Sequence, residues 1–142
     1  CHDKVLAWRA DDVERRPAAV SKLGTAILRA GAWACRPENV ARMAQHLSAS
    51  DRLALPAPLI ERILDGELIQ GADRPSRAIL PFIRFDREAL RPDPDDADWV
   101  LSGMQSAGQV VVTPQIREIA RNVFATACFE GISAAIDKAP KI

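Results

Sequence analysis

Apolar residues recur every three or four positions along much of the chain, which is the period of a helix with one buried face. The first such run, AAVSKLGTAILRAGAW, follows Pro17. Proline suits the first position of a helix because the N–H that it lacks would have no partner there. The pattern therefore predicts a helix that begins at Pro17. The residues expected on its buried face are Val20, Leu23, Ile27, Ala30 and Gly31.

Two glycines, Gly24 and Gly31, lie seven positions apart within this predicted helix and so share nearly the same face. A glycine inside a helix costs roughly 1 kcal/mol relative to alanine. We therefore predict that another backbone packs closely against this face and offsets the cost.

Two further helices are predicted between residues 37 and 66. RPENVARMAQHLS begins a helix around Pro37, with Glu38 in the first turn, where negative charge is favourable. LPAPLIERILDGEL predicts another helix, which Gly66 would end. The expected core residues are Val40, Met43, Ala44 and Leu47 in the first of these helices, and Leu59, Ile60, Ile63 and Leu64 in the second.

The stretch RPDPDDADWVLSGMQSAGQV is strongly acidic at its start and then apolar. A calcium loop of the EF-hand type that began at Asp93 would need glycine at its sixth position and glutamate at its twelfth, where Asp98 and Met104 stand. The aspartates fit better at the N-terminus of a helix, which attracts negative charge. We predict a helix that ends at Gly108. Its apolar stripe would comprise Trp99, Val100, Met104 and Ala107.

Extended structure is expected at two places. KVLAW, from Lys4 to Trp8, is predicted as a short strand, followed by a polar link to Pro17. LIQGADRPSRAI, residues 68–79, is predicted as a loop. ILPFIRF, residues 79–85, is predicted as an edge or irregular extended segment because it contains proline.

The tail, TPQIREIARNVFATACFEGISAAI, is predicted to be helical. Thr113 can cap the helix, Pro114 can start it, and Gly131 can break or bend it before Ile136. Residues 137–142 are expected to fray. The expected core residues of the tail are Ile116, Ile119, Val123 and Phe124.

Composition narrows the classes of protein that the chain can represent. Its 142 residues fit one domain with a sizeable apolar core. The 19 basic and 19 acidic residues balance, which removes the electrostatic argument for a nucleic-acid partner or an anionic membrane. No apolar run approaches the roughly 18 residues of a membrane span. The three cysteines are widely spaced, which predicts neither a disulfide framework nor a metal site, and free thiols favour a reducing compartment.

The chain begins at Cys1, for which three interpretations compete. They are a bacterial lipoprotein, an N-terminal nucleophile, and the rear part of a longer protein. The third is preferred, because no flexible spacer follows Cys1 and no convincing base accompanies it.

Residues that could carry chemistry are few. The sequence contains no phosphate-binding glycine loop, no CxxC, no HExxH and no GxSxG motif. His46 is isolated in its segment and is expected at a solvent-facing or edge position of its helix. We therefore predict no catalytic residue, no metal and no cofactor. Lys22 and Thr25 stand one turn apart on the first predicted helix, either as surface polar residues or in a cleft where they touch an anion.

The segments together resemble the C-terminal portion of the nitrate- and bicarbonate-binding proteins of bacterial ABC importers, and the related cytoplasmic nitrate/nitrite sensors. The features that carry the resemblance are DKVLAWRADDVERRP, AILRAGAW, RPENVARMAQHLS, LPAPLIERILDGEL and IRFDREALRPDPDDADWVLSGMQSAGQV, in this order. The family commonly has Trp-Gly-Gln where this chain has Ala107 before Gly108 and Gln109, and the RPDP approach is closer to the sensor-type members.

The resemblance implies an α/β, predominantly helical fragment of a two-lobed type II periplasmic-binding-protein fold. Residues 1–142 would supply the end of the second lobe and the helices that return to the first, with the N-terminal portion absent. A cleft-facing lysine of the family aligns with Thr25, and Lys22 lies one turn earlier, so the ligand-binding candidates are Lys22 and Thr25.

The implied ligand is a small anion: nitrate, nitrite or bicarbonate. The implied protein partner is an ABC transporter permease, with a periplasmic or membrane-associated location. For a sensor it would be a regulatory protein in the cytoplasm, released when the ligand binds.

Overall fold

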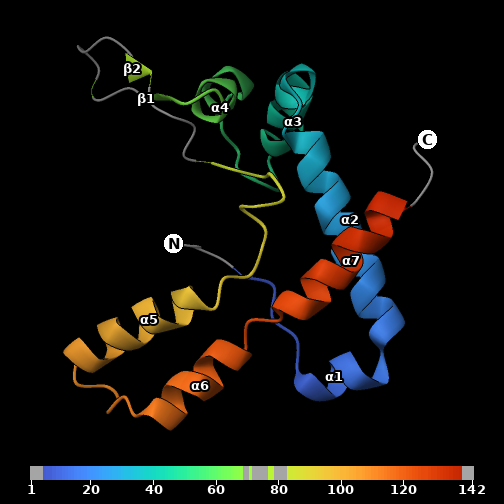
Figure 1. Ribbon diagram of the computed structural model, residues 1–142. Helices are drawn as coiled ribbons and strands as arrows, with labels where there is room; N and C mark the ends of the chain where they lie inside the picture. Colours follow the sequence, from blue (N-terminus) through green and yellow to red (C-terminus); the bar gives the residue numbers. More distant parts are fainter. Residues whose placement is uncertain (1–4, 69–70, 72–76, 79–82, 139–142) are drawn as a thin grey trace. The chain divides into compact units, whose positions relative to one another are not determined.

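The computed structural model describes residues 5–68, 71, 77–78 and 83–138, and it is mainly helical (Figure 1). The predominance of helix was predicted and is confirmed. The elements are α1 (Ala10–Arg15), α2 (Pro17–Ala34), the 3-10 helix η1 (Pro37–Asn39), α3 (Val40–Leu47), α4 (Ala57–Leu64), β1 (Glu67–Leu68), β2 (Arg77–Ala78), α5 (Asp95–Ser106), α6 (Pro114–Asn122) and α7 (Thr126–Lys138).

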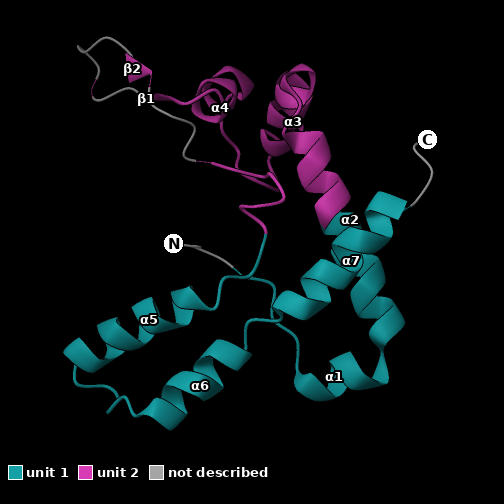
Figure 2. Ribbon diagram, in the orientation of Figure 1, with its two compact units in different colours: residues 1–27, 91–142 teal, residues 28–90 magenta. Residues whose placement is uncertain are grey.

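The chain divides into two compact units, which Figure 2 shows in different colours. Unit 1 comprises residues 1–27 and 91–142, and unit 2 comprises residues 28–90. Helix α2 therefore contributes its first part to unit 1 and its last part to unit 2.

In unit 2, α3 and α4 pack against each other around small and branched apolar side chains. Ala44 is fully buried and Ile60 is only 3% exposed. Gly66 has a positive φ of 80° directly after α4, as expected of a glycine that ends a helix. Leu59 was predicted in this core and is exposed instead, because its side chain points about 100° around α4 from that of Ile60.

The C-terminal part of α2 also packs within unit 2. A Cβ atom placed on Gly31 would lie 2.5 Å from the carbonyl oxygen of Phe85 and 2.6 Å from Leu90 Cδ1. The segment that follows residue 83 is held in a turn, since Arg84 makes two hydrogen bonds to the Asp86 carboxylate, at 2.8 and 2.9 Å. Close packing of a backbone against Gly31 was predicted and is confirmed.

In unit 1, the first part of α2 packs against α7. Val20 and Ile132 are buried, and a Cβ atom on Gly24 would lie 2.5 Å from Ile132 Cδ1. The neighbour of Gly24 is thus a side chain rather than the backbone that we predicted. Helices α5 and α6 form the other packed pair of this unit, with Ala97 and Leu101 of α5 buried.

The residues of the apolar stripe predicted for α5 lie on this helix or at its end, but they are not buried within the described residues. Trp99 is 65% exposed, and Val100, Met104 and Ala107 are exposed as well. The helix itself begins and ends where the sequence predicted, and the Asp93 carboxylate accepts a hydrogen bond of 3.0 Å from the Asp95 N–H at its start. The buried side of α5 is therefore the side that packs against α6, where Ala97 and Leu101 lie, and not the side with the largest side chains.

The predicted strand from Lys4 to Trp8 is wrong within the described residues. Val5 to Trp8 have no regular structure, and α1 forms where a polar link was expected. An isolated strand has no intrinsic stability, because its N–H and C=O groups need a neighbouring strand. Among the described residues, strands occur only as the two-residue pair β1 and β2.

That antiparallel pair lies at the two ends of the loop predicted over residues 68–79, where Glu67 pairs with Ala78 and Leu68 with Arg77. The middle of the predicted loop lies outside the described residues, as does most of the extended segment predicted over residues 79–85.

The tail forms two helices rather than one. Thr113 caps α6 as predicted, since its hydroxyl oxygen accepts a hydrogen bond from the Ile116 N–H. The break falls at residues 123–125, whereas Gly131, the predicted break, lies inside α7. Ile119 and Val123, which were expected in the core, are 61% and 75% exposed. The fraying expected at the end lies mostly outside the described residues.

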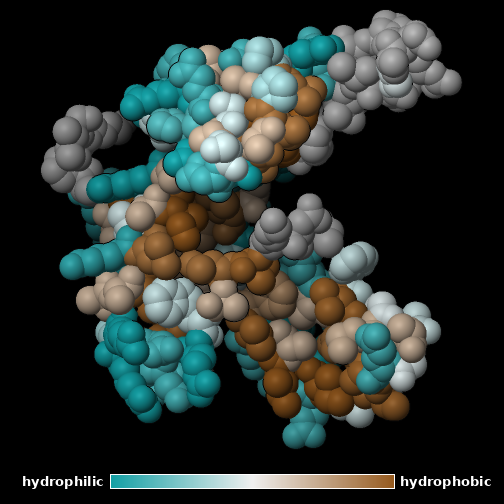
Figure 3. Space-filling model, turned by 180° about the vertical axis from the view of Figure 1, so that it is seen from behind, coloured by the Kyte–Doolittle hydropathy of each residue, from teal (hydrophilic) through white to brown (hydrophobic). Residues whose placement is uncertain are grey.

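Large apolar side chains remain on the surface of several helices, as Figure 3 shows from the opposite side to Figure 1. Helix α6 has no buried residue at all within the described chain. Because helices of this length are stabilised mainly by packing of an apolar face, the exposed faces of α5 and α6 are suited to contacts beyond those that the described residues make. No helix in the described ranges is long and apolar enough to cross a lipid bilayer.

Candidate functional site

The two residues predicted to touch an anion, Lys22 and Thr25, both lie on α2 in the part that belongs to unit 1. Lys22 is exposed and Thr25 is half-buried, next to Gly24 and its contact with Ile132 of α7. Neither residue lines the concavity described below. The helix therefore presents one ammonium group and one hydroxyl about a turn apart, and both groups can donate hydrogen bonds to an anion.

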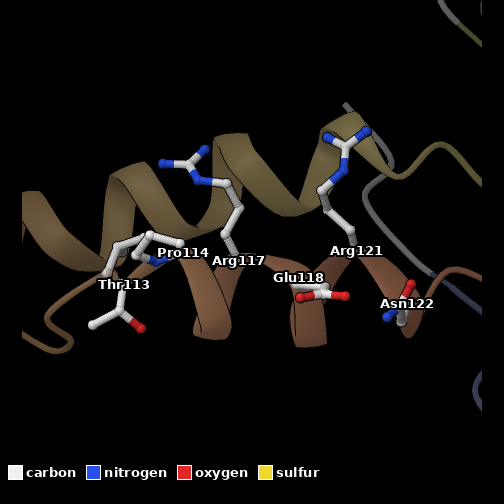
Figure 4. A pocket seen from close by; sticks show the side chains of 7 residues that line it. Thr113, Pro114, Arg117, Glu118, Arg121 and Asn122 are labelled. Atoms are coloured by element: carbon white, nitrogen blue, oxygen red, sulfur yellow. The ribbon is translucent and has the colours of Figure 1, made fainter.

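A shallow concavity of about 510 Å³ lies along α6 and was not predicted (Figure 4). In Figure 4, Arg117 and Arg121 extend from α6 towards α5, whereas Glu118 does not. The remaining lining residues are Val112, Thr113, Pro114 and Asn122.

The two arginines are held by carboxylates of α5. Arg121 makes a hydrogen bond of 2.8 Å to Asp95, and both Arg117 and Arg121 make hydrogen bonds to Asp98. We call these four residues the α5–α6 ion cluster. The sequence signal for this cluster is a pair of aspartates three positions apart on one helix and a pair of arginines four positions apart on the next, since each pair shares one helix face. The α5–α6 ion cluster thus links the two helices. Because carboxylates already neutralise both guanidinium groups, the concavity offers little free positive charge to an anion.

The ion cluster shifts two pKa values in opposite directions. Partial burial acts to raise the pKa of Asp98, but hydrogen bonds from Arg121 and Arg117 outweigh it and lower the pKa below its ordinary value. Hydrogen bonds from the guanidinium group of Arg121 to Asp95 and Asp98 raise the pKa of Arg121. The cluster is thus most stable when both types of group are ionised.

Acid should weaken the α5–α6 ion cluster. Because the pKa of Asp98 is lower in the folded chain, its ionised form stabilises the fold above the unfolded pKa of about 3.9, and this stabilisation is lost as the pH falls through the lower folded pKa. Titration of the Asp98 carboxyl carbon by NMR should give a midpoint below that ordinary value. In the double variant Arg117→Gln/Arg121→Gln the midpoint should rise. An unchanged midpoint in the double variant would contradict this assignment.

Nothing in the described ranges assembles a metal centre. No three His, Cys, Asp or Glu side chains in those ranges come close enough to hold a metal ion. His46 is exposed, as predicted, and Cys35 and Cys128 are free thiols. Cys1 lies outside the described residues. The groups that the structure offers are suited to hydrogen bonding and ion pairing.

Comparison with known proteins gives similarities in sequence and in structure. The chain is 34% identical over 71 residues to the bicarbonate-binding proteins of Synechococcus elongatus and of another Synechococcus strain. The crystal structure of the periplasmic nitrate-binding protein from Synechocystis PCC 6803 superimposes with a TM-score of 0.80, at 22% identity, over 92% of this chain. No family model matches the chain.

The chain is homologous to the bicarbonate-binding proteins and shares its fold with the nitrate-binding protein. The resemblance stated from the sequence is confirmed. So is the predicted fold class, because the mainly helical chain matches a part of a periplasmic binding protein. The matched region spans 16% of the bicarbonate-binding proteins and 34% of the solved nitrate-binding chain.

Proposed function

We propose that the chain is part of a solute-binding receptor that serves an ABC importer and holds a small anion of the nitrate, nitrite or bicarbonate type. The observation that carries the proposal is the TM-score of 0.80 over 92% of the chain to a nitrate-binding protein. The separate sequence match to bicarbonate-binding proteins supports the same class of ligand. Both kinds of relative are named as binding proteins, which supports binding rather than catalysis.

In this proposal residues 1–142 are the C-terminal portion of the receptor, which comprises the end of the second lobe and the helices that return to the first. The anion would lie between two lobes that close around it by a hinge motion. A permease would be the protein partner, and the receptor would be periplasmic or attached to the membrane surface. The finding that the match covers 34% of the solved chain supports a partial fold.

We assign Lys22 and Thr25 of α2 to the anion. Lys22 is exposed and would supply a positive charge, and the hydroxyl of Thr25 would donate a hydrogen bond without adding charge. The arginines of the α5–α6 ion cluster are poorer candidates because Asp95 and Asp98 already neutralise them.

The assignment is tested by joining the chain to the missing part of the fold. The part of the Synechocystis nitrate-binding protein that lies outside the structural match, here called the complementary polypeptide, is co-expressed with the chain. Calorimetry of the complex with nitrate and bicarbonate should show that Lys22→Met raises the Kd about tenfold or more, since it removes a charge-assisted hydrogen bond. Thr25→Val should have a smaller effect.

Lys138→Met is the matched control, because Lys138 is also exposed but lies at the end of α7. It should leave the Kd unchanged. Equal effects of the two lysine substitutions would show that only net charge matters, and would remove Lys22 from the site.

A second candidate function is a cytoplasmic nitrate/nitrite sensor of the same fold, which would release a regulatory partner on binding its ligand. The free thiols of Cys35 and Cys128 favour it, since unpaired cysteines are typical of a reducing compartment. Fractionation of the native cells distinguishes the two functions. Recovery with the cytoplasm would support the sensor, and recovery with the periplasm or membranes would support the importer receptor.

A further inference from the structure

Helix α6 has little apolar contact with the rest of unit 1. None of its residues, Pro114–Asn122, all of which the structure describes, is buried, and its half-buried apolar residues are Ile116 and Ala120. The contact between α3 and α4 in unit 2 is different, because Ala44 is fully buried there and Ile60 is 3% exposed. A helix as short as α6 is marginal by itself, so it depends on the few contacts that it makes.

The segments on either side of α6 do not anchor it. Helix α5 is followed by Gly108, which has a positive φ of 69°, and residues 109–113 are irregular. Residues 123–125 are irregular as well, and they separate α6 from α7. Val111 is 80% exposed and Val123 is 75% exposed, so neither connection is packed at these positions. Helix α6 can therefore move without disrupting the helices before and after it.

The strongest contacts of α6 are those of the α5–α6 ion cluster (Figure 4). Arg121 is hydrogen-bonded to Asp95 and Asp98, and Arg117 to Asp98. The four side chains are between 29% and 77% exposed, so water and dissolved ions reach them. Single exposed ion pairs contribute little to stability, and a network contributes more. Salt screens such a network, since the Debye length falls from about 10 Å at 0.1 M to about 3 Å at 1 M.

We propose that α6 is a salt-dependent element of unit 1. It packs on α5 at low ionic strength and separates from α5 when salt screens the α5–α6 ion cluster. Helices α2 and α7 stay packed, because they meet through the buried Val20 and Ile132, which carry no charge to be screened. Separation of α6 exposes Ala97 and Leu101, the buried residues of α5, to water. The change is therefore local unfolding of one element and not of the whole chain.

Hydrogen–deuterium exchange of the full chain, followed by mass spectrometry at about 0.05 M and about 1 M sodium chloride, tests the proposal. The N–H groups of α6 should exchange about fivefold faster or more at the higher salt concentration. Helices α2 and α3 are the internal controls, because apolar side chains, and no ion pair of the described residues, hold them. Their exchange should change little between the two salt concentrations.

Two variants separate the ion cluster from other effects of salt. In Arg117→Gln/Arg121→Gln, α6 should exchange fast at both salt concentrations, while α2 and α3 keep their wild-type protection and show that the chain is folded. Glu118→Gln is the matched control, since Glu118 is a charged, exposed residue of α6 that does not belong to the ion cluster. This variant should retain the salt-dependent exchange of the wild-type chain.

Three results would overturn the proposal. One is equal exchange of α6 at the two salt concentrations in the wild-type chain. Another is a salt dependence that persists in Arg117→Gln/Arg121→Gln, which would assign it to something other than the ion cluster. The third is a loss of protection in α2 and α3 as large as that in α6, which would indicate global unfolding. None of these results bears on the proposed anion site, because Lys22 and Thr25 lie on α2.

Discussion

Replacing Ile60 with alanine should lower the free energy of unfolding of unit 2 by about 2–5 kcal/mol, the usual cost of a large-to-small change in a core. Ile60 is 3% exposed and lies on α4, which packs against α3 with its fully buried Ala44. A cavity at this position should lower the free energy of unfolding strongly, because unit 2 has few other buried side chains among its described residues and little other apolar packing to stabilise it.

Leu59→Ala is the control for Ile60→Ala, since the neighbouring Leu59 is 36% exposed. It should cost less than about 1 kcal/mol. Urea denaturation followed by the fluorescence of Trp33, which lies in unit 2, measures both variants in a background where Trp8 and Trp99 are phenylalanine. Similar losses from the two substitutions would contradict the orientation of α4.

Gly31→Ala should be the second costly substitution, with a loss of about 1–3 kcal/mol from overpacking. The added Cβ would lie 2.5 Å from the carbonyl oxygen of Phe85, and a backbone atom cannot move aside without shifting the segment that follows residue 83. Gly24→Ala should cost less, because its neighbour is the flexible end of the Ile132 side chain. The same urea denaturation measures Gly31→Ala, and circular dichroism follows Gly24→Ala in unit 1.

Gly131→Ala is the control for this series, and it should change the free energy of unfolding in the opposite direction. Gly131 has open space around it inside α7, so alanine should raise stability by up to about 1 kcal/mol through helix propensity alone. A gain in stability from Gly31→Ala as well would show that Phe85 does not pack against α2.

Local signals in the sequence predicted the helix boundaries well. Pro17 begins α2, Thr113 caps α6 and Gly66 ends α4, each through an effect that acts within a few residues. The acidic start of α5 was also assigned correctly, because the charge preference of a helix N-terminus does not depend on the rest of the fold.

Predictions that required contact with a segment distant in the sequence were less accurate. The strand at Lys4–Trp8 needed a second strand to pair with, and the stripe with Trp99 needed a surface to cover it. Periodicity identifies an apolar face but does not say whether its partner lies in the same chain. For this reason Trp99 could be placed on a helix from the sequence, whereas its exposure could not be predicted.

The candidate site was predictable only through resemblance. Lys22 and Thr25 have ordinary spacing for helix surface residues, and it was the likeness to anion-binding proteins that selected them. The α5–α6 ion cluster was missed because it joins Asp98 to Arg117 and Arg121, and the pairing of those residues depends on how two helices meet.

Titration with nitrate, of the chain alone and of the chain with the complementary polypeptide, tests most directly the claim that these residues are one part of an anion receptor. Half of the proposed cleft is missing from the chain alone, so its Kd should be no tighter than about 1 mM, whereas the complex should bind nitrate or bicarbonate in the micromolar range. Micromolar binding by the chain alone, or no binding of either anion by a well-formed complex, would contradict the account.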